Sequence, residues 1–95
     1  MTLMIARSYI VRGRVQGVGF RWFVDHEARQ LGLAGWVRNN IDGTVEVLAM
    51  GSADQHAALL AKLQRGPRAA RVDEVQQLPA EPVAGLTTFR IEGAW

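Results

Sequence analysis

Residues 8–31 have the sequence SYIVRGRVQGVGFRWFVDHEARQL, and the prediction of the fold begins from this stretch. Over residues 8–15 every second position is apolar or small, a period typical of a strand with one buried face. Gly17 and Gly19 interrupt the alternation, and over residues 20–31 the apolar positions recur at helical spacing. The stretch therefore predicts a strand, a loop with two glycines and an amphipathic helix.

After this helix the sequence predicts a β-hairpin. Gly32 and Leu33 follow the last apolar residue of the helix, which is typical of a glycine C-terminal cap with its hydrophobic contact. Alternating residues then run through positions 35–50, on both sides of the turn signal Asp42-Gly43. We expect two antiparallel strands joined at this turn.

The second half of the chain predicts another helix and two more strands. Residues 52–55 match a capping box, and leucines continue at helical spacing to about residue 64. The apolar residues within 72–78 are spaced by three, which fits either a helical turn or a bulged strand, and we favour the strand. A loop is expected at residues 79–85, and a last strand at 87–92.

The order of elements, β-α-β-β-α-β, predicts a fold class. It is the order of an α+β, ferredoxin-like sandwich, in which two helices cover one face of a mostly antiparallel sheet. We expect a single domain over residues 1–95, because a chain of 95 residues is too short to build two cores. This fold hosts many unrelated activities, so the function must be argued from a site.

The composition argues against several classes of protein. The chain has no cysteine and two histidines, so we expect no disulfide, no thiolate nucleophile, no metal and no cofactor. No apolar run approaches the roughly 18 residues of a membrane span, and residues 1–6 are too short for the apolar region of a signal peptide. We therefore expect a cytoplasmic protein with no membrane contact.

The charge is distributed unevenly along the chain, although the formal net charge is only +2. Arg7, Arg12, Arg14 and Arg21 all precede the first acidic residue, Asp25. This pattern favours an anionic partner, and the planar guanidinium group suits phosphate or carboxylate. The excess of arginine over lysine can equally reflect genome composition.

Arg21 lies in the first turn of the predicted helix, where a cation is unfavourable because the helix N-terminus already carries unpaired N–H groups. A bound anion would offset this cost. Glycines before the helix let successive backbone N–H groups turn toward a small phosphate, although an ordinary connection also uses glycines. The spacing matches neither the dinucleotide nor the nucleoside-triphosphate motif. The candidate loop comprises Gln16, Gly17, Val18, Gly19 and Phe20.

Asn39 is the second candidate site residue. The alternation places it on the face of Val37, toward the helices, at the end of its strand. Alternatively it begins the turn at residues 39–43 and bonds its own backbone, as Asn commonly does. We expect His26 and His56 on the surface or at a helix cap, and the sequence suggests no carboxylate pair or serine–histidine relay.

Three stretches together resemble the signatures of the acylphosphatase family. They are GRVQGVGFR at residues 13–21, GWVRN at 35–39 and GTVE at 43–46, and the likeness continues to FRI at 89–91. Acylphosphatases have the ferredoxin-like fold and hydrolyse the carboxyl–phosphate anhydride of acyl phosphates without a metal. The resemblance implies the same fold and the same activity for this chain.

The resemblance also implies roles for the candidate residues. Arg21 matches the arginine that binds the substrate phosphate, the backbone of residues 16–20 matches the phosphate-cradling loop, and Asn39 matches the asparagine that positions the attacking water. The partner would be a small-molecule acyl phosphate, with no nucleic acid and no membrane, and we expect a monomer. Related domains occur in larger hydrogenase-maturation proteins that handle carbamoyl phosphate. Without zinc-finger cysteines, this chain is expected to be the stand-alone enzyme.

One departure from the family pattern lies at the C-terminus. The family usually has a basic residue and a tyrosine after Phe-x-Ile, whereas this chain continues with Glu92-Gly93-Ala94-Trp95. The departure concerns contacts of the tail and not the two candidate catalytic positions.

Two other functions stand as alternatives. The element order, the sequence pI near 9.9 and the stretch at residues 17–23 also resemble an RNA-recognition domain. In that domain the glycine and aromatic signature lies within the third strand, whereas here the third predicted strand, residues 44–50, has no aromatic residue. The other alternative is a domain that keeps the phosphate loop and binds without turnover.

Overall fold

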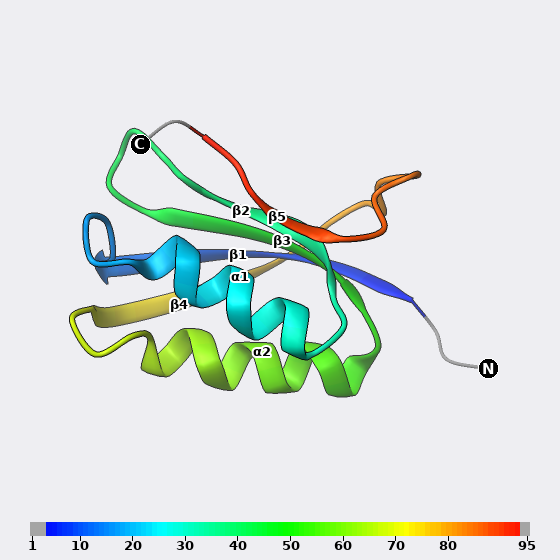
Figure 1. Cartoon of the computed structure of the whole chain (residues 1–95), viewed down its shortest axis with the longest axis horizontal. Helices are drawn as coiled ribbons and strands as arrows, with labels where there is room; N and C mark the ends of the chain where they lie inside the picture. Colours follow the sequence, from blue (N-terminus) through cyan, green and yellow to red (C-terminus); the bar gives the residue numbers. More distant parts are fainter. Residues whose placement is uncertain (1–3, 94–95) are drawn as a thin grey trace.

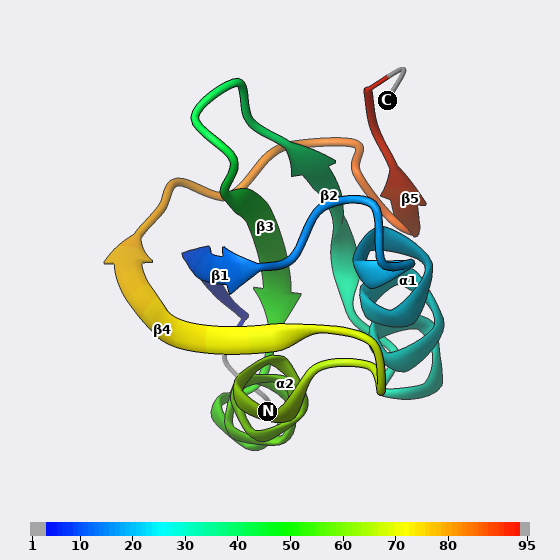
Figure 2. The same ribbon diagram turned by 90° about the vertical axis from the view of Figure 1, so that its left-hand side faces the viewer.

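The structure, a computed structural model, describes residues 4–93 and consists of one five-stranded sheet with two helices packed on one of its faces (Figures 1 and 2). The order of strands across the sheet is β4-β1-β3-β2-β5. The expected α+β, ferredoxin-like arrangement is confirmed. The elements are β1 (Ile5–Arg14), α1 (Phe20–Gln30), β2 (Ala34–Asn39), β3 (Val45–Gly51), α2 (Ala53–Arg65), β4 (Arg71–Pro79) and β5 (Phe89–Ile91).

The sheet is antiparallel except at one edge. β3 pairs antiparallel with both β1 and β2, and β4 pairs antiparallel with β1. The β1–β4 register shifts between Arg12 and Gly13, so the bulged strand expected near residues 72–78 is confirmed. The last strand is shorter than expected, and it pairs parallel with β2 as a fifth strand.

The core lies between the sheet and the helices, because alternate residues of β1 and β3 face the helices. Tyr9 and Val11 of β1 and Val45 and Val47 of β3 are 0% exposed. Each such side chain stabilises the fold by roughly 1.5–3 kcal/mol through its removal from water. The core also contains Val15, Phe20, Val24, Ala28, Leu33, Val37, Ala49, Leu59, Leu63 and Phe89.

Both expected helix boundaries are confirmed. α1 ends with Gly32 in the left-handed region at φ 75°, and the N–H of Leu33 donates to the carbonyl of Ala28 at 3.0 Å. α2 begins with the capping box: the Gln55 N–H donates to Ser52 Oγ at 3.2 Å, and the Ser52 N–H donates to Gln55 Oε1 at 2.7 Å. These local bonds explain why the sequence pattern alone located both ends.

The connection from β4 to β5, residues 80–88, crosses the sheet on the face opposite the helices (Figure 2, orange). The Val83 N–H lies 3.3 Å from Met50 Sδ, and Met50 is 4% exposed. The sequence predicted a loop here, but not that it would cover an apolar side chain on this face.

His56 is a buried residue of α2, so the expectation of a surface or capping histidine was wrong for it. Its side chain is 0% exposed, and its Nε2 lies 2.8 Å from the carbonyl oxygen of Ile5. A carbonyl only accepts, so Nε2 carries the proton, and Nδ1 accepts from the Tyr9 hydroxyl at 2.7 Å. A neutral imidazole therefore joins α2 to β1 inside the core. His26, by contrast, is exposed as expected.

We predict that acid weakens the fold through His56. Burial lowers the pKa of His56 below its ordinary value of 6.5, so below that pH the unfolded chain binds a proton that the folded chain does not. The free energy of unfolding should therefore fall as the pH is lowered through 6.5 toward the lower pKa of the folded state, by at most about 1.4 kcal/mol per pH unit. Urea denaturation of wild type, His56→Gln and the exposed-histidine control His26→Gln measures this. An equal pH dependence in wild type and His56→Gln would contradict the assignment.

Candidate active site

The loop between β1 and α1 has a backbone that requires glycine. Gly17 has φ 71° and Gly19 has φ 77°, both in the left-handed region that other residues rarely adopt. A Cβ added at either position would meet no described atom within 4 Å. The glycines are therefore needed for chain direction, and the surface beside them is open.

The start of α1 is left without a side-chain cap. Gly19 is the N-cap residue, and within the described chain no side chain caps this helix and no acidic residue lies in its first turn. Phe20, 2% exposed, packs that turn into the core. Unpaired N–H groups and the positive end of the helix dipole therefore lie beside the open glycine loop, as an anion site requires.

Gln16 ties this loop to the turn between β2 and β3. Its side-chain amide donates from Nε2 to the carbonyl of Asn40 at 2.7 Å and to the carbonyl of Thr44 at 2.9 Å. The sequence identified Gln16 only as a member of the loop. Its partners are 24 and 28 residues away, and no local pattern predicts such bonds.

The β2–β3 turn is itself held by side chains. Asp42 Oδ1 accepts from the Thr44 N–H at 3.0 Å and from the Thr44 hydroxyl at 2.7 Å, and these bonds hold the pKa of Asp42 below its ordinary value. Asn40 Nδ2 donates to Thr44 Oγ1 at 3.1 Å and to Glu46 Oε1 at 3.2 Å. The turn therefore fixes the end of β2, where Asn39 is half-buried.

Arg21 is held by the segment that follows β5. Its Nη1 donates to the carbonyl of Glu92 at 3.2 Å and lies 3.5 Å from the carbonyl of Gly93. The Glu92 N–H in turn donates to the carbonyl of Val37 at 2.8 Å. The tail therefore positions one nitrogen of the guanidinium group through backbone atoms. Ala94 and Trp95, also part of the divergent ending, lie outside the described residues.

These groups meet around a hollow of about 220 Å³, which we call the loop pocket. Of the candidate residues, Arg21, Asn39, Gly17, Gly19 and Phe20 line it. Gln16 acts from outside through its bonds to the turn, and Val18 packs against the core. The complete lining is Val15, Gly17, Gly19, Phe20, Arg21, Trp22 and Asn39.

A second hollow adjoins the first at Asn39. This turn pocket has a volume of about 440 Å³ and is formed by the β2–β3 turn and the tail. Asn39 lines both pockets. The lining of the turn pocket is Arg38, Asn39, Asn40, Ile41, Glu92 and Gly93.

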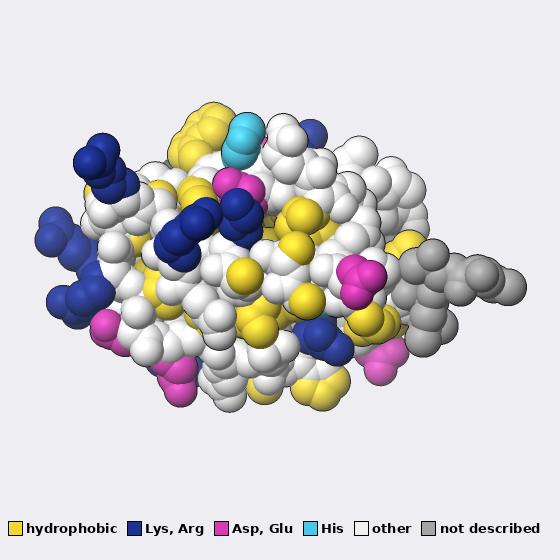
Figure 3. Space-filling view, turned by 90° about the horizontal axis from the view of Figure 1, so that it is seen from below, with side chains coloured by type: hydrophobic (Ala, Val, Ile, Leu, Met, Phe, Trp, Pro, Cys, Tyr) yellow, Lys and Arg dark blue, Asp and Glu magenta, His cyan; other side chains and the backbone are white. Residues whose placement is uncertain are grey.

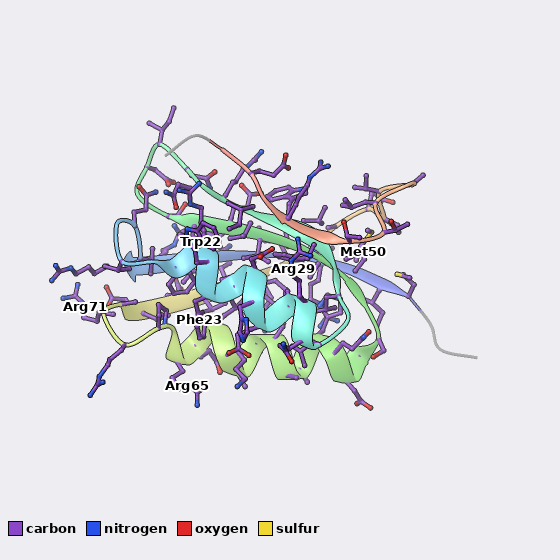
Figure 4. All side chains as sticks on the ribbon, viewed as in Figure 1. Trp22, Phe23, Arg29, Met50, Arg65 and Arg71 are labelled. Carbon is purple, nitrogen blue, oxygen red and sulfur yellow. The ribbon has the colours of Figure 1, made fainter. Side chains whose placement is uncertain are left out.

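Basic side chains gather at the end of the molecule that carries the loop pocket. Figure 3 shows Lys and Arg side chains at this left-hand end, and Figure 4 places Arg71 there beside the β1–α1 loop. Arg14 and Arg71 are paired in the β1–β4 ladder, and Arg71 forms an ion pair with Asp73 at 3.1 Å. Arg12 forms an ion pair with Glu74 at 3.1 Å, so its charge is largely offset and it contributes less to the field than the sequence suggested.

Comparison with known proteins shows the family. A family model described as acylphosphatase matches residues 7–91, which is most of the chain. The chain belongs to the acylphosphatase family. Acylphosphatases are hydrolases that act on acyl phosphates, so the chain is an enzyme of this class.

Individual relatives cover nearly the whole chain. An acylphosphatase of Koribacter versatilis is 61% identical over 94% of this chain and 81% of its own length. The crystal structure of an acylphosphatase from Bacillus subtilis matches with a TM-score of 0.89 and 36% identity, over 96% of this chain and all of that one. Full-length HypF, in a phosphate- and nucleotide-bound form, matches with a TM-score of 0.89 and 31% identity, but this chain covers only 12% of it.

Two observations argue against the RNA-recognition alternative. The family model that matches the chain is that of acylphosphatases, and the glycine stretch lies in the β1–α1 loop and not in β3.

Among residues 4–93, no group of three or more His, Cys, Asp or Glu side chains could hold a metal ion. The helices of the described chain are also too short or too polar to cross a membrane.

We predict that Gln16 supports both the fold and the site. Gln16→Ala removes two hydrogen bonds to half-buried carbonyl groups and should lower the free energy of unfolding by about 1–3 kcal/mol. It should also lower kcat/KM for acetyl phosphate by about tenfold or more, because the loop is no longer fixed beside Asn39. Chemical denaturation and steady-state kinetics measure the two effects, with the exposed Gln77→Ala as the matched control. Equal behaviour of the two variants would show that the tether is dispensable.

Proposed function

We propose that the loop pocket binds the phosphate of an acyl phosphate and that the chain hydrolyses the carboxyl–phosphate bond. The observation that carries the proposal is the meeting of three features at one pocket of about 220 Å³: the Arg21 guanidinium, the open glycine loop at an uncapped helix start, and Asn39. The family assignment supports the same reaction.

In this proposal the phosphate is bound by backbone and guanidinium donors together. The N–H groups of residues 16–20 point toward it from the loop and the first turn of α1, and Arg21 supplies a fixed positive charge. Nη1 is engaged with the tail, so Nη2 and Nε are the nitrogen atoms available for the phosphate oxygens. Donors held in place before the substrate arrives need little reorganisation as charge develops on the phosphoryl group.

Asn39 holds the attacking water. The water oxygen forms a bond to phosphorus while the bond from phosphorus to the carboxyl oxygen breaks, and the carboxylate leaves with the electron pair. Both protons of the water end on inorganic phosphate. Catalysis then comes from position and charge, because Asn39 orients the nucleophile and Arg21 binds the oxygens on which charge develops.

The reaction needs no metal and no general acid in this proposal. A carboxylate is a stable anion at neutral pH, so the leaving group requires no proton. Arg21 and the loop supply the positive charge that a metal ion supplies in other phosphoryl-transfer sites.

We predict that loss of either Arg21 or Asn39 abolishes most of the activity. Arg21→Gln should lower kcat/KM for acetyl phosphate by about 10³-fold or more, because it removes the charge that binds the developing oxyanion. Asn39→Ala should lower kcat by a similar order with a smaller change in KM, because the water loses its orientation while the phosphate site remains. Hydrolysis is followed with EDTA present, after circular dichroism has confirmed folding.

The controls separate the proposal from its alternatives. Arg68→Gln, an exposed arginine in the α2–β4 connection, is the matched control for a lost positive charge. Binding of inorganic phosphate without hydrolysis of any acyl phosphate would favour the domain that binds without turnover. Full activity in Arg21→Gln, or loss of activity on adding EDTA, would reject the mechanism.

We also predict that salt slows the enzyme at low substrate concentration. The basic end around the loop pocket should attract anionic substrate, and salt screens exposed charges beyond a Debye length of about 10 Å at 0.1 M. Raising the ionic strength from about 0.02 to about 0.3 M should lower kcat/KM roughly two- to fivefold, less so in Arg14→Gln. Stopped assays across a sodium chloride series measure this, and an unchanged slope in Arg14→Gln would remove that residue from the steering field.

A further inference from the structure

Trp22 is an exposed aromatic residue at the mouth of the loop pocket. Its side chain is 73% exposed, and it lies in the first turn of α1 (Figure 4). With Arg21 it belongs to the lining of the pocket. Among residues 4–93 the exposed large hydrophobic side chains are Met4, Trp22, Ile41, Leu78 and Val83. Of these, Trp22 alone lines the loop pocket, whereas Ile41, which is 95% exposed, lines the turn pocket.

The two exposed side chains line different pockets, and Asn39 belongs to both. The loop pocket extends from Asn39 at the end of β2 to Trp22 in the first turn of α1. The turn pocket, with Ile41, begins at Asn39 and extends toward the β2–β3 turn and the tail. An acyl group bound next to the phosphate could therefore contact either Trp22 or Ile41, and the direction of the reaction distinguishes them.

In-line displacement places the attacking water and the leaving group on opposite sides of phosphorus. This step rests on the proposed function, in which Asn39 holds the water. The leaving carboxylate then lies on the side of phosphorus away from Asn39. Within the described lining of the loop pocket, the side chain that is both large and apolar and also exposed is Trp22, in the first turn of α1.

We propose that Trp22 is the acyl-binding side chain and that it gives the enzyme a preference for aromatic and large apolar acyl phosphates over small ones. The indole ring offers a flat apolar face that a benzoyl or alkyl group can cover, and both surfaces lose contact with water when they meet. An acetyl group has too little surface to use most of that face. Trp22 determines specificity and takes no part in bond making or breaking.

Because Trp22 is exposed, its replacement can change the preference for substrates without also destabilising the fold. A side chain that is 73% exposed contributes little to the core, so its replacement should leave the fold intact. Ile41 is the matched control, since it is also apolar and exposed but lines the turn pocket and not the loop pocket.

The experiment compares kcat/KM for benzoyl phosphate and acetyl phosphate in wild type, Trp22→Ala, Trp22→Phe and Ile41→Ala. In Trp22→Ala the ratio of benzoyl to acetyl should fall by roughly five- to tenfold, mainly through a higher KM for benzoyl phosphate. Trp22→Phe keeps a flat aromatic ring and should restore most of the ratio. Ile41→Ala should leave the ratio within about twofold of wild type.

Two outcomes overturn the proposal. An unchanged ratio in Trp22→Ala would remove Trp22 from the acyl site, and a fall in Ile41→Ala instead would place the acyl group on the side of Asn39. Titration calorimetry with unreactive benzylphosphonate and methylphosphonate gives a readout that does not depend on turnover. If the wild type hydrolyses neither substrate, the proposed function fails, and the phosphonate titrations still decide whether Trp22 contacts the larger group.

Discussion

The side-chain amide of Gln16 is the contact that joins the two halves of the site. β1 and β2 both run antiparallel to β3, so they point in the same direction, and their C-terminal ends lie at the same end of the sheet. β3 lies between them, and the loop after β1 and Asn39 at the end of β2 are not neighbours through the ladder. The two bonds from Gln16 to the carbonyls of Asn40 and Thr44 span this gap. The topology of the sheet brings the glycine loop and Asn39 to the same end of the sheet, and the side-chain amide of Gln16 fixes the distance between them.

The positive charges near the site lie at different distances from the loop pocket. The guanidinium of Arg21 lies at the pocket itself, directed by backbone carbonyls that occupy one of its nitrogens. Farther out, Arg14 lies at the end of β1 opposite Arg71 at the start of β4, and the charge of Arg71 is largely offset by its ion pair with Asp73 at 3.1 Å. The charge of Arg21 has a fixed direction and suits binding, whereas the exposed Arg14 acts at a distance through the electric field.

Local patterns in the sequence predicted most of the fold. The alternation over residues 8–15, the cap at Gly32 and the capping box at Ser52 depend on neighbours within a few residues, and all three are confirmed. Arg21 and the glycine loop were found in the same way, because a cation at an uncapped helix start conflicts with the helix dipole. Asn39 followed from strand alternation together with the family resemblance.

The features that the sequence did not predict depend on contacts between distant residues. His56 is 47 residues from Tyr9, and nothing near it in the chain signals a buried polar pair. The role of Gln16, the parallel pairing of β5 with β2 and the path of residues 80–88 likewise follow from how the whole sheet is assembled. A polar residue on an amphipathic helix has the same local pattern whether it faces water or a hydroxyl inside the core.

The tail holds Arg21 through its main chain, so the side chain at position 92 is free to vary. The carbonyls of Glu92 and Gly93 receive the guanidinium, and the Glu92 N–H fastens this segment to Val37, so every atom involved belongs to the main chain. A substitution at position 92 changes a side chain and leaves these peptide groups in place. Position 92 can therefore change while the contact to Arg21 is kept, whereas position 93 is constrained, because Gly93 has φ 88°, a conformation that other residues rarely adopt. The divergence of the ending is tolerated where only a side chain changes, and it is restricted where the main chain itself must turn.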